Sequence, residues 1–197
     1  LDKNIKIIII GSGPAGISAA LKLEKLKVET LILEAGDIDL KSDQSLYLSG
    51  NVEGDNYPDL SSVRLYQFGG SSNLWGGVCN PFKDHDFDEW PIEIKDLNIY
   101  SKEAKAILNL KKKFYNKKFS KNLDLYNLVW SDVRFGEKYY QYIKKSKYIN
   151  LSLNTYFLNF NGSGKKVESL SCSKNEKIYK IKANYFILSC GGIENSR

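Results

Sequence analysis

The sequence predicts an α/β protein built on a doubly wound parallel sheet of the Rossmann type, with a β-meander attached to it. Three observations lead to this fold class. An apolar strand near the start of the chain runs into a glycine-rich turn and an apolar-periodic helix, a second apolar strand ends in an acidic residue, and the last third of the chain alternates like antiparallel strands. The order strand, glycine turn, helix, strand, acid is typical of a nucleotide-binding βαβ unit.

The glycine turn is the most informative part of this unit. The strand before it is expected over residues 5–10 and the helix after it over residues 14–26. Gly11 permits the tight turn, Gly13 lets the backbone approach a pyrophosphate, and Gly16 lets the helix pack closely on the sheet. The N-terminus of the helix presents free N–H groups to phosphates. We therefore expect a dinucleotide to be bound by Gly11, Ser12, Gly13, Pro14, Ala15 and Gly16.

The second strand, expected over residues 29–34, ends in Glu34, 18 residues after Gly16. A carboxylate at this position can accept hydrogen bonds from both ribose hydroxyls of an adenosine, and it would repel a 2′-phosphate. Ala35, which follows directly, is included in the expected site. The fingerprint alone does not separate NAD from FAD, although its place at the start of the chain is typical of many flavoproteins.

A second glycine-rich segment, GGSSNLWGG, occupies residues 69–77. Its small residues allow main chain to lie against a pyrophosphate or the edge of an isoalloxazine ring without a side-chain clash. Asn73 and Trp75 are polar or large enough to shape the reactive face, while packing of Trp75 in the core is the alternative interpretation. The expected contacts are Gly69, Gly70, Ser71, Ser72, Asn73, Trp75, Gly76 and Gly77.

The middle of the chain, residues 37–148, is expected to be an excursion with a helical insertion. Residues 37–64 lack clear periodicity, whereas helical spacing predicts a helix over residues 94–110 and a short amphipathic one over residues 136–145. Residues 111–130 between these helices read as irregular.

Residues 149–190 are expected to form the β-meander and a strand that returns to the nucleotide sheet. Asn161-Gly162-Ser163-Gly164 is a hairpin turn signal. The whole of residues 1–197 is therefore interpreted as one FAD-type nucleotide-binding domain. Its late strands are predicted at residues 150–160, 167–173, 177–182 and, as a buried strand, 185–190.

Composition and charge narrow the possible functions. A chain of 197 residues with 42% hydrophobic and 26% charged residues is ordinary for a soluble globular domain, and no apolar run is long enough to span a membrane. The net charge of +6 could suggest nucleic acid, but we interpret the lysine-rich patch within residues 111–118 as a solvated face and expect no nucleic-acid partner. Its aromatic residues are expected to pack inward, namely Phe114, Tyr115 and Phe119.

The remaining sequence features concern whether the chain is a whole protein and which of its residues could bind a metal or act in catalysis. The chain begins with Leu1, contains no methionine and stops at Arg197, so we expect it to be a fragment of a longer protein. No signal peptide is visible, and the expected location is the cytoplasm. The three cysteines have no metal-ligand spacing, no metal site is expected, and Cys190 is expected to be a buried thiol. The only histidine, His85, falls in a polar loop and is not expected to be a catalytic base.

Taken together, GGSSNLWGG at residues 69–77 and CGGIENSR at residues 190–197 resemble the glucose–methanol–choline (GMC) oxidoreductase family. The resemblance implies an FAD-binding domain followed by an α+β substrate domain that is largely absent here. It also implies cofactor contacts by Cys190 and Gly191 and a backbone contact of Phe157 with the adenine. Some members join FAD covalently to a histidine that corresponds to Leu74, so the flavin is expected to be held non-covalently.

The family chemistry is oxidation of a CH–OH group of an alcohol, sugar or polyol by hydride transfer to flavin N5. The catalytic base of the family is a histidine, paired with another histidine or an asparagine, that lies beyond this chain, so the catalytic residues, the substrate and the electron acceptor stay open. Two other interpretations remain. One is a different two-dinucleotide flavoprotein, although the chain has no second GxGxxG and no CxxC, and the other is a non-catalytic flavin-binding protein.

Overall fold

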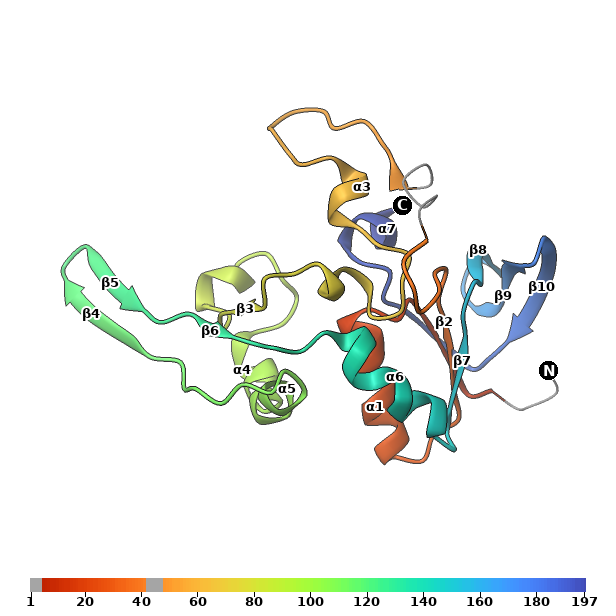
Figure 1. Ribbon diagram of the computed structural model, residues 1–197, viewed down its shortest axis with the longest axis horizontal. Coiled ribbons are helices and arrows are strands. Elements are labelled where there is room, and N and C mark those ends of the chain that lie inside the picture. Colours follow the sequence, from red (N-terminus) through yellow and green to blue (C-terminus); the bar gives the residue numbers. More distant parts are fainter. Residues whose placement is uncertain (1–4, 42–47) are drawn as a thin grey trace. The chain divides into compact units, whose positions relative to one another are not determined.

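The structure, a computed structural model, describes residues 5–41 and 48–197 (Figure 1). The chain divides into two compact units, which are described separately. The first comprises the described residues up to Leu74 together with Arg134–Arg197, and the second comprises Trp75–Val133. The predicted excursion over residues 37–148 includes residues 42–47, which lie outside the described residues.

A four-stranded parallel sheet with the strand order β11-β1-β2-β7 forms the centre of the first unit. The first strand of the chain therefore lies between the second strand and a strand near the other end of the sequence. Its run of isoleucines suits a central strand that is covered on both faces. The strands are β1 (Ile7–Ile10), β2 (Thr30–Leu33), β7 (Ile149–Ser152) and β11 (Tyr185–Leu188).

Two helices, α1 (Pro14–Lys25) and α6 (Phe135–Lys145), lie side by side on one face of this sheet (Figure 1). Both confirm helices predicted from the sequence. α6 buries Phe135, Tyr139 and Ile143, which recur every four residues and so form one apolar stripe.

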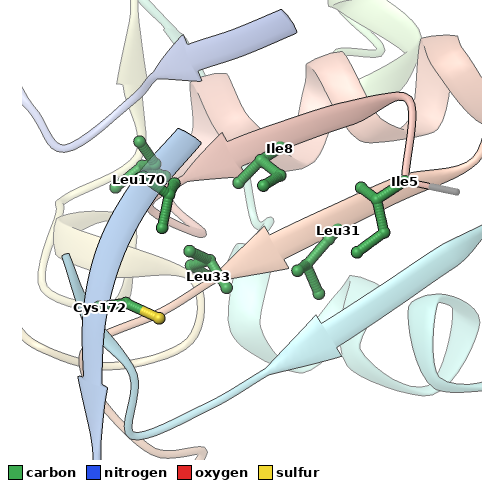
Figure 2. Packing of buried hydrophobic residues seen from close by; sticks show 7 residues of the cluster. Ile5, Ile8, Leu31, Leu33, Leu170 and Cys172 are labelled. Atoms are coloured by element: carbon green, nitrogen blue, oxygen red, sulfur yellow. The ribbon is translucent and has the colours of Figure 1, made fainter. Parts of the chain in front are cut away.

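A three-stranded antiparallel sheet of order β10-β9-β8 covers the other face and confirms the predicted meander. Figure 2 shows Leu170 and Cys172 of β9 directed toward Ile8, Leu31 and Leu33 of the parallel sheet. Burying a side chain of this size contributes roughly 1.5–3 kcal/mol, so this cluster is a main source of the unit's stability. The strands are β8 (Tyr156–Gly162), β9 (Val167–Lys174) and β10 (Lys177–Lys182).

The single strand predicted over residues 150–160 is wrong, because two strands of different sheets occupy it. β7 belongs to the parallel sheet and β8 to the meander. Asn154 between them has a left-handed backbone, with φ of 51°, which ends one strand and redirects the chain. The strand over residues 185–190 is also less buried than predicted. β11 lies at the edge of the sheet, and Tyr185 is 62% exposed.

The first unit also contains two short helices between β2 and the second unit: α3 (Leu60–Val63) and η1 (Gly70–Asn73), a 3-10 turn. A third, α7 (Gly192–Ser196), follows the glycine pair near the end of the chain.

The second unit consists of short elements. The helix predicted over residues 94–110 is wrong as a single element, because the chain forms α4 (Ile94–Asn98) and α5 (Ser101–Ile107). The junction Asn98-Ile99-Tyr100-Ser101 combines residues of modest helix propensity, which explains the break. The other elements are η2 (Asp84–Phe87) and the paired strands β3 (Val78–Cys79) and β6 (Val129–Trp130).

The irregular segment predicted over residues 111–130 is a β-hairpin instead. β4 (Asn116–Ser120) pairs with β5 (Leu123–Tyr126), and every residue of both strands is exposed. Phe119 and Tyr115, expected to pack inward, are 70% and 56% exposed. Lysines occupy adjacent as well as alternating positions in this segment, so it lacks the alternation of polar and apolar residues by which a strand is recognised. Its polar composition therefore led to the wrong prediction of an irregular segment.

Candidate dinucleotide-binding site

The predicted glycine turn lies at the carboxyl end of β1, between the ends of the two strands that flank it. Gly11 N donates to Leu33 O at the end of β2, at 2.8 Å, and Ser189 N after β11 donates to Ile10 O, also at 2.8 Å. The carboxyl edge of an open parallel sheet is where ligands of α/β proteins bind.

Gly11 and Gly16 are glycines because the protein itself closes around them. Gly11 has φ of 100°, and a Cβ there would lie 2.5 Å from Ser189 O. A Cβ on Gly16 would lie 2.1 Å from Gly11 O and 2.6 Å from Ser189 Oγ. The turn, the start of α1 and the segment after β11 are therefore packed backbone against backbone.

Gly13 has no such reason to be a glycine. Its φ of −71° is open to any residue, and nothing lies within 4 Å of the position that a Cβ would occupy. No side chain caps α1 at this end, and its first turn carries no acidic residue, so its free N–H groups stay available to an anion. The space in front of Gly13 is thus open to a group that the backbone could approach, and the predicted phosphate contact stays a prediction.

The second glycine segment begins against the first. Gly69 N donates to Ser12 O at 3.0 Å, and a Cβ on Gly70 would lie 3.0 Å from Gly13 Cα. Gly69 and Gly70 both have positive φ, at 98° and 57°. The structure therefore brings together two glycine segments that are more than 50 residues apart in the sequence.

The side chains of η1 are engaged within the protein. Ser71 Oγ donates to Val63 O at 3.2 Å, and Ser72 Oγ donates to Gly69 O at 2.7 Å and accepts from Phe135 N at 3.4 Å. Asn73 Nδ2 donates to Gln67 Oε1 at 3.0 Å and to Phe68 O at 2.9 Å. These side chains hold the loop to its neighbours, so their predicted cofactor contacts stay predictions.

The third glycine segment follows β11 and completes the edge. Ser189 Oγ lies 2.8 Å from both Ile10 O and Gly11 O, to which it donates. The sequence reasoning placed Ser189 at the start of the third glycine segment but did not include it among the predicted site residues, because a serine after a strand carries no specific signal. Gly191 has φ of 85° and open space at its Cβ position. Cys190 is half-buried rather than buried, and burial is the main cause that raises the pKa of its thiol.

Glu34 lies at the end of β2 and is only 5% exposed. Its Oε2 accepts hydrogen bonds from Ser12 N at 2.9 Å and Ser12 Oγ at 2.6 Å, and its Oε1 accepts one from Gly36 N at 2.8 Å. Burial raises the pKa of Glu34, and the hydrogen bonds from Ser12 and Gly36 partly offset this. A carboxylate has about four acceptor positions, so Glu34 can take a further donor such as a ribose hydroxyl.

The other predicted contacts have varied surroundings. Pro14 and Ala15 are exposed on the first turn of α1, and Ala35 is half-buried after Glu34. Phe157 on β8 packs its ring against the core, with its centroid 4.8 Å from that of the Phe160 ring. The predicted contact of the Phe157 backbone with the adenine stays a prediction.

Trp75, Gly76 and Gly77 belong to the second unit. Trp75 is half-buried and its indole Nε1 donates to Val133 O at 3.0 Å. Gly77 has φ of 78°, and a Cβ there would lie 2.2 Å from Ser131 O. Trp75 and Gly77 therefore have local packing roles. The predicted contacts of Trp75, Gly76 and Gly77 with a cofactor stay predictions.

Comparison with known proteins clarifies the fold. No family model and no curated protein sequence matches the chain. Solved structures do match, among them pyridoxine 4-oxidase from Mesorbium loti, with 17% identity and a TM-score of 0.61 over 98% of this chain and 50% of that one. The chain has the fold of the GMC oxidoreductases.

Two further structures support this assignment. An FAD-dependent oxidoreductase from Chaetomium thermophilum matches with 15% identity and a TM-score of 0.64, over 95% of this chain and 46% of that one. A fungal aryl-alcohol oxidase matches with 11% identity and a TM-score of 0.60, over 97% and 46%. The chain thus spans about half the length of the structures that it matches, and the resemblance predicted from the glycine segments is confirmed at the level of the fold.

The described residues were also compared with the requirements of a membrane-spanning helix and of a metal site. Over residues 5–41 and 48–197, no helix combines the length and the apolar character needed to cross a membrane. The same residues contain no group of three or more His, Cys, Asp or Glu side chains that could hold a metal ion.

Proposed function

We propose that the protein binds FAD non-covalently at the carboxyl edge of its parallel sheet and serves the oxidation of a CH–OH group of an alcohol, sugar or polyol. The observation that carries the proposal is the open space at Gly13, a glycine that nothing in the surrounding protein requires. Gly70 lies against Gly13, and Gly191 follows two residues after Ser189, whose N–H donates to Ile10 O at this edge, so glycines of three segments suit a ligand longer than a mononucleotide.

The residues of this chain have separate tasks in such a complex. The N–H groups at the start of α1 bind the pyrophosphate, Glu34 accepts from the adenosine ribose, and the glycines let the backbone approach. Bound FAD would supply the hydride acceptor. His85 is 69% exposed on η2 of the second unit and is not assigned as the base.

Non-covalent binding rests on Leu74. This residue stands where some GMC members carry the histidine that is joined to FAD, and a leucine side chain has no atom that can form that bond. Acid precipitation of the loaded protein should release all flavin into the supernatant. Flavin retained in the pellet, on a peptide that includes residues 69–77, would contradict this.

The cofactor is tested by denaturing the purified protein and identifying the released nucleotide by absorbance and mass. We expect FAD, or uptake of FAD by the apoprotein. Recovery of NAD alone, with no uptake of FAD, would refute the proposal.

The reaction is tested by anaerobic bleaching of the bound flavin with a panel of alcohols, sugars and polyols, followed by readmission of oxygen or another acceptor. FAD binding without bleaching by any member of the panel would favour a different flavin enzyme or a non-catalytic flavin-binding protein.

The cytoplasmic location likewise stays a proposal, and fractionation of the source cells would test it.

A further inference from the structure

An ion pair between Arg64 and Glu194 joins the chain that leads into the second glycine segment to the short helix that follows the third. Both side chains are largely buried, with 14% and 16% exposure. Arg64 Nη1 donates to Glu194 Oε1, Nη2 donates to Leu48 O, and Nε donates to Leu60 O at 3.3 Å. The guanidinium thus binds three partners from three segments at once, which a planar, always charged group does well.

The second oxygen of Glu194 has a different partner. Arg197 Nη2 lies 3.0 Å from Glu194 Oε2, but the Arg197 side chain is 76% exposed. One carboxylate therefore has a buried arginine on one side and an exposed arginine on the other. Solvent screens the exposed contact far more than the buried one.

Glu194 lies in the first turn of α7, directly after the turn at Gly191. Gly191, three residues before Glu194, has φ of 85° and open space at its Cβ position. Two other side-chain hydrogen bonds here are local, since Asn195 Oδ1 accepts from Cys190 N at 2.9 Å and Ser196 Oγ donates to Gly192 O at 2.8 Å. On its other side the turn is tied to β1, because Cys190 Sγ donates to Ile10 O at 3.3 Å. Arg64 connects this turn to the segment that continues into Gly69 and Gly70.

The sheet order indicates which half of a dinucleotide this turn would meet. β2, which Glu34 follows directly, and β11, which leads to Gly191, lie on opposite sides of β1. If Glu34 holds the adenosine ribose, the other half of the ligand extends past Gly13 toward Gly191.

We propose that Arg64 and Glu194 are a positioning pair, which holds the Gly191 turn against the flavin half of FAD and has no part in binding the adenosine half. The inference rests on the proposed FAD binding. Removal of one partner leaves a buried charge unpaired, so the turn shifts, and the loss falls on the part of the ligand that this turn contacts.

The experiment compares the affinities for FAD and ADP in the purified protein and in four variants. FAD binding is followed by quenching of flavin fluorescence, and ADP binding by calorimetry. The variants are Arg64→Ala, Glu194→Gln, the double variant Arg64→Ala/Glu194→Gln, and Arg197→Ala, which removes the exposed partner of the same carboxylate.

Arg64→Ala and Glu194→Gln should each raise the Kd for FAD tenfold or more and leave the Kd for ADP within twofold. The double variant should lose less than the product of the two single effects, because the two residues act as one unit. Arg197→Ala should leave both Kd values within twofold. Retained ADP binding also reports that each variant is folded.

Two results would overturn the inference: an unchanged Kd for FAD in Arg64→Ala, or parallel losses of FAD and ADP, which would indicate a general structural role. Wild-type protein that is folded but binds no FAD would instead refute the proposed function.

Discussion

At the scale of single residues, Gly13 and Gly16 belong to one motif but face different surroundings. Gly16 is enclosed by the backbone of Gly11 and the side chain of Ser189, whereas Gly13 faces open space. The fold therefore requires Gly16, whereas the proposed ligand is what would require Gly13. Substitution by alanine can separate the two requirements.

Gly13→Ala should leave the free energy of unfolding without ligand within about 1 kcal/mol, because loss of a helix N-cap glycine and reduced freedom of the unfolded chain largely offset each other. It should nevertheless weaken FAD binding. Gly16→Ala should lower the free energy of unfolding by about 1–3 kcal/mol, as overpacking does. Urea denaturation of the apoprotein and FAD titration measure both effects. A large loss of stability in Gly13→Ala would show that the fold, and not a ligand, requires this glycine.

Glu34 leads to a prediction on pH. Burial raises its pKa in the folded protein above the ordinary value of 4.5, so at pH values between these two pKa values the folded state binds more protons than the unfolded state. The contribution of Glu34 to stability is therefore greatest below that value and falls as the pH rises through the raised pKa.

In Glu34→Gln this pH dependence should disappear. The difference in unfolding free energy, wild type minus variant, should decrease from pH 4 upward and level off above the raised pKa. Urea denaturation of the apoproteins across pH 4–8 measures it. A difference that grows with pH would mean that the hydrogen bonds from Ser12 and Gly36 outweigh the cost of burial.

At the scale of elements, the β4–β5 hairpin differs most from the rest of the molecule. All residues of its strands are exposed, including Leu123 at 56% and Leu125 at 50%. An isolated two-stranded hairpin is marginally stable in water. By contrast, Ile8, Ile9 and Ile32 in the parallel sheet are completely buried.

Hydrogen exchange should therefore separate these elements. Amides of β4 and β5 should show opening free energies near ~0 kcal/mol, while those of β1 and β2 approach the global value. Exchange followed by mass spectrometry gives both in one experiment, with β9 as an internal reference. Strong protection of the hairpin would mean that a partner covers it.

The elements also show how far sequence reasoning reaches. The glycine turn with its flanking strands and helix could be predicted, because the glycines, the apolar strands and the helical pattern follow one another within one βαβ unit, although Ser189, which also encloses Gly11 and Gly16, lies far away in the sequence. The break between β7 and β8 could not, since the left-handed Asn154 is held by Gly36 O, Asp37 and Lys41, far away in the sequence. The Arg64–Glu194 pair spans 130 positions and gives no local pattern.

At the scale of the whole molecule, ligand binding and folding are linked. If the sheet edge forms only in the folded chain, FAD at about 100 times its Kd should add about 2.7 kcal/mol to the free energy of unfolding. NAD at the same concentration should add much less. Thermal denaturation with each nucleotide measures this, with ADP as the control for the shared half. Equal stabilisation by NAD and FAD would contradict the choice of FAD.

The position of β11 in the sequence also affects how the parallel sheet forms during synthesis of the chain. β1 leaves the ribosome well before its second neighbour, β11, because Gly11 and Ser189 are 178 positions apart. At roughly 5–20 residues per second, the isoleucine strand waits about 10 to 35 seconds with one edge unpaired. An apolar strand with a free edge is a template for association with other nascent chains. The yield of soluble protein should therefore depend on translation rate and on chaperones that shield nascent chains.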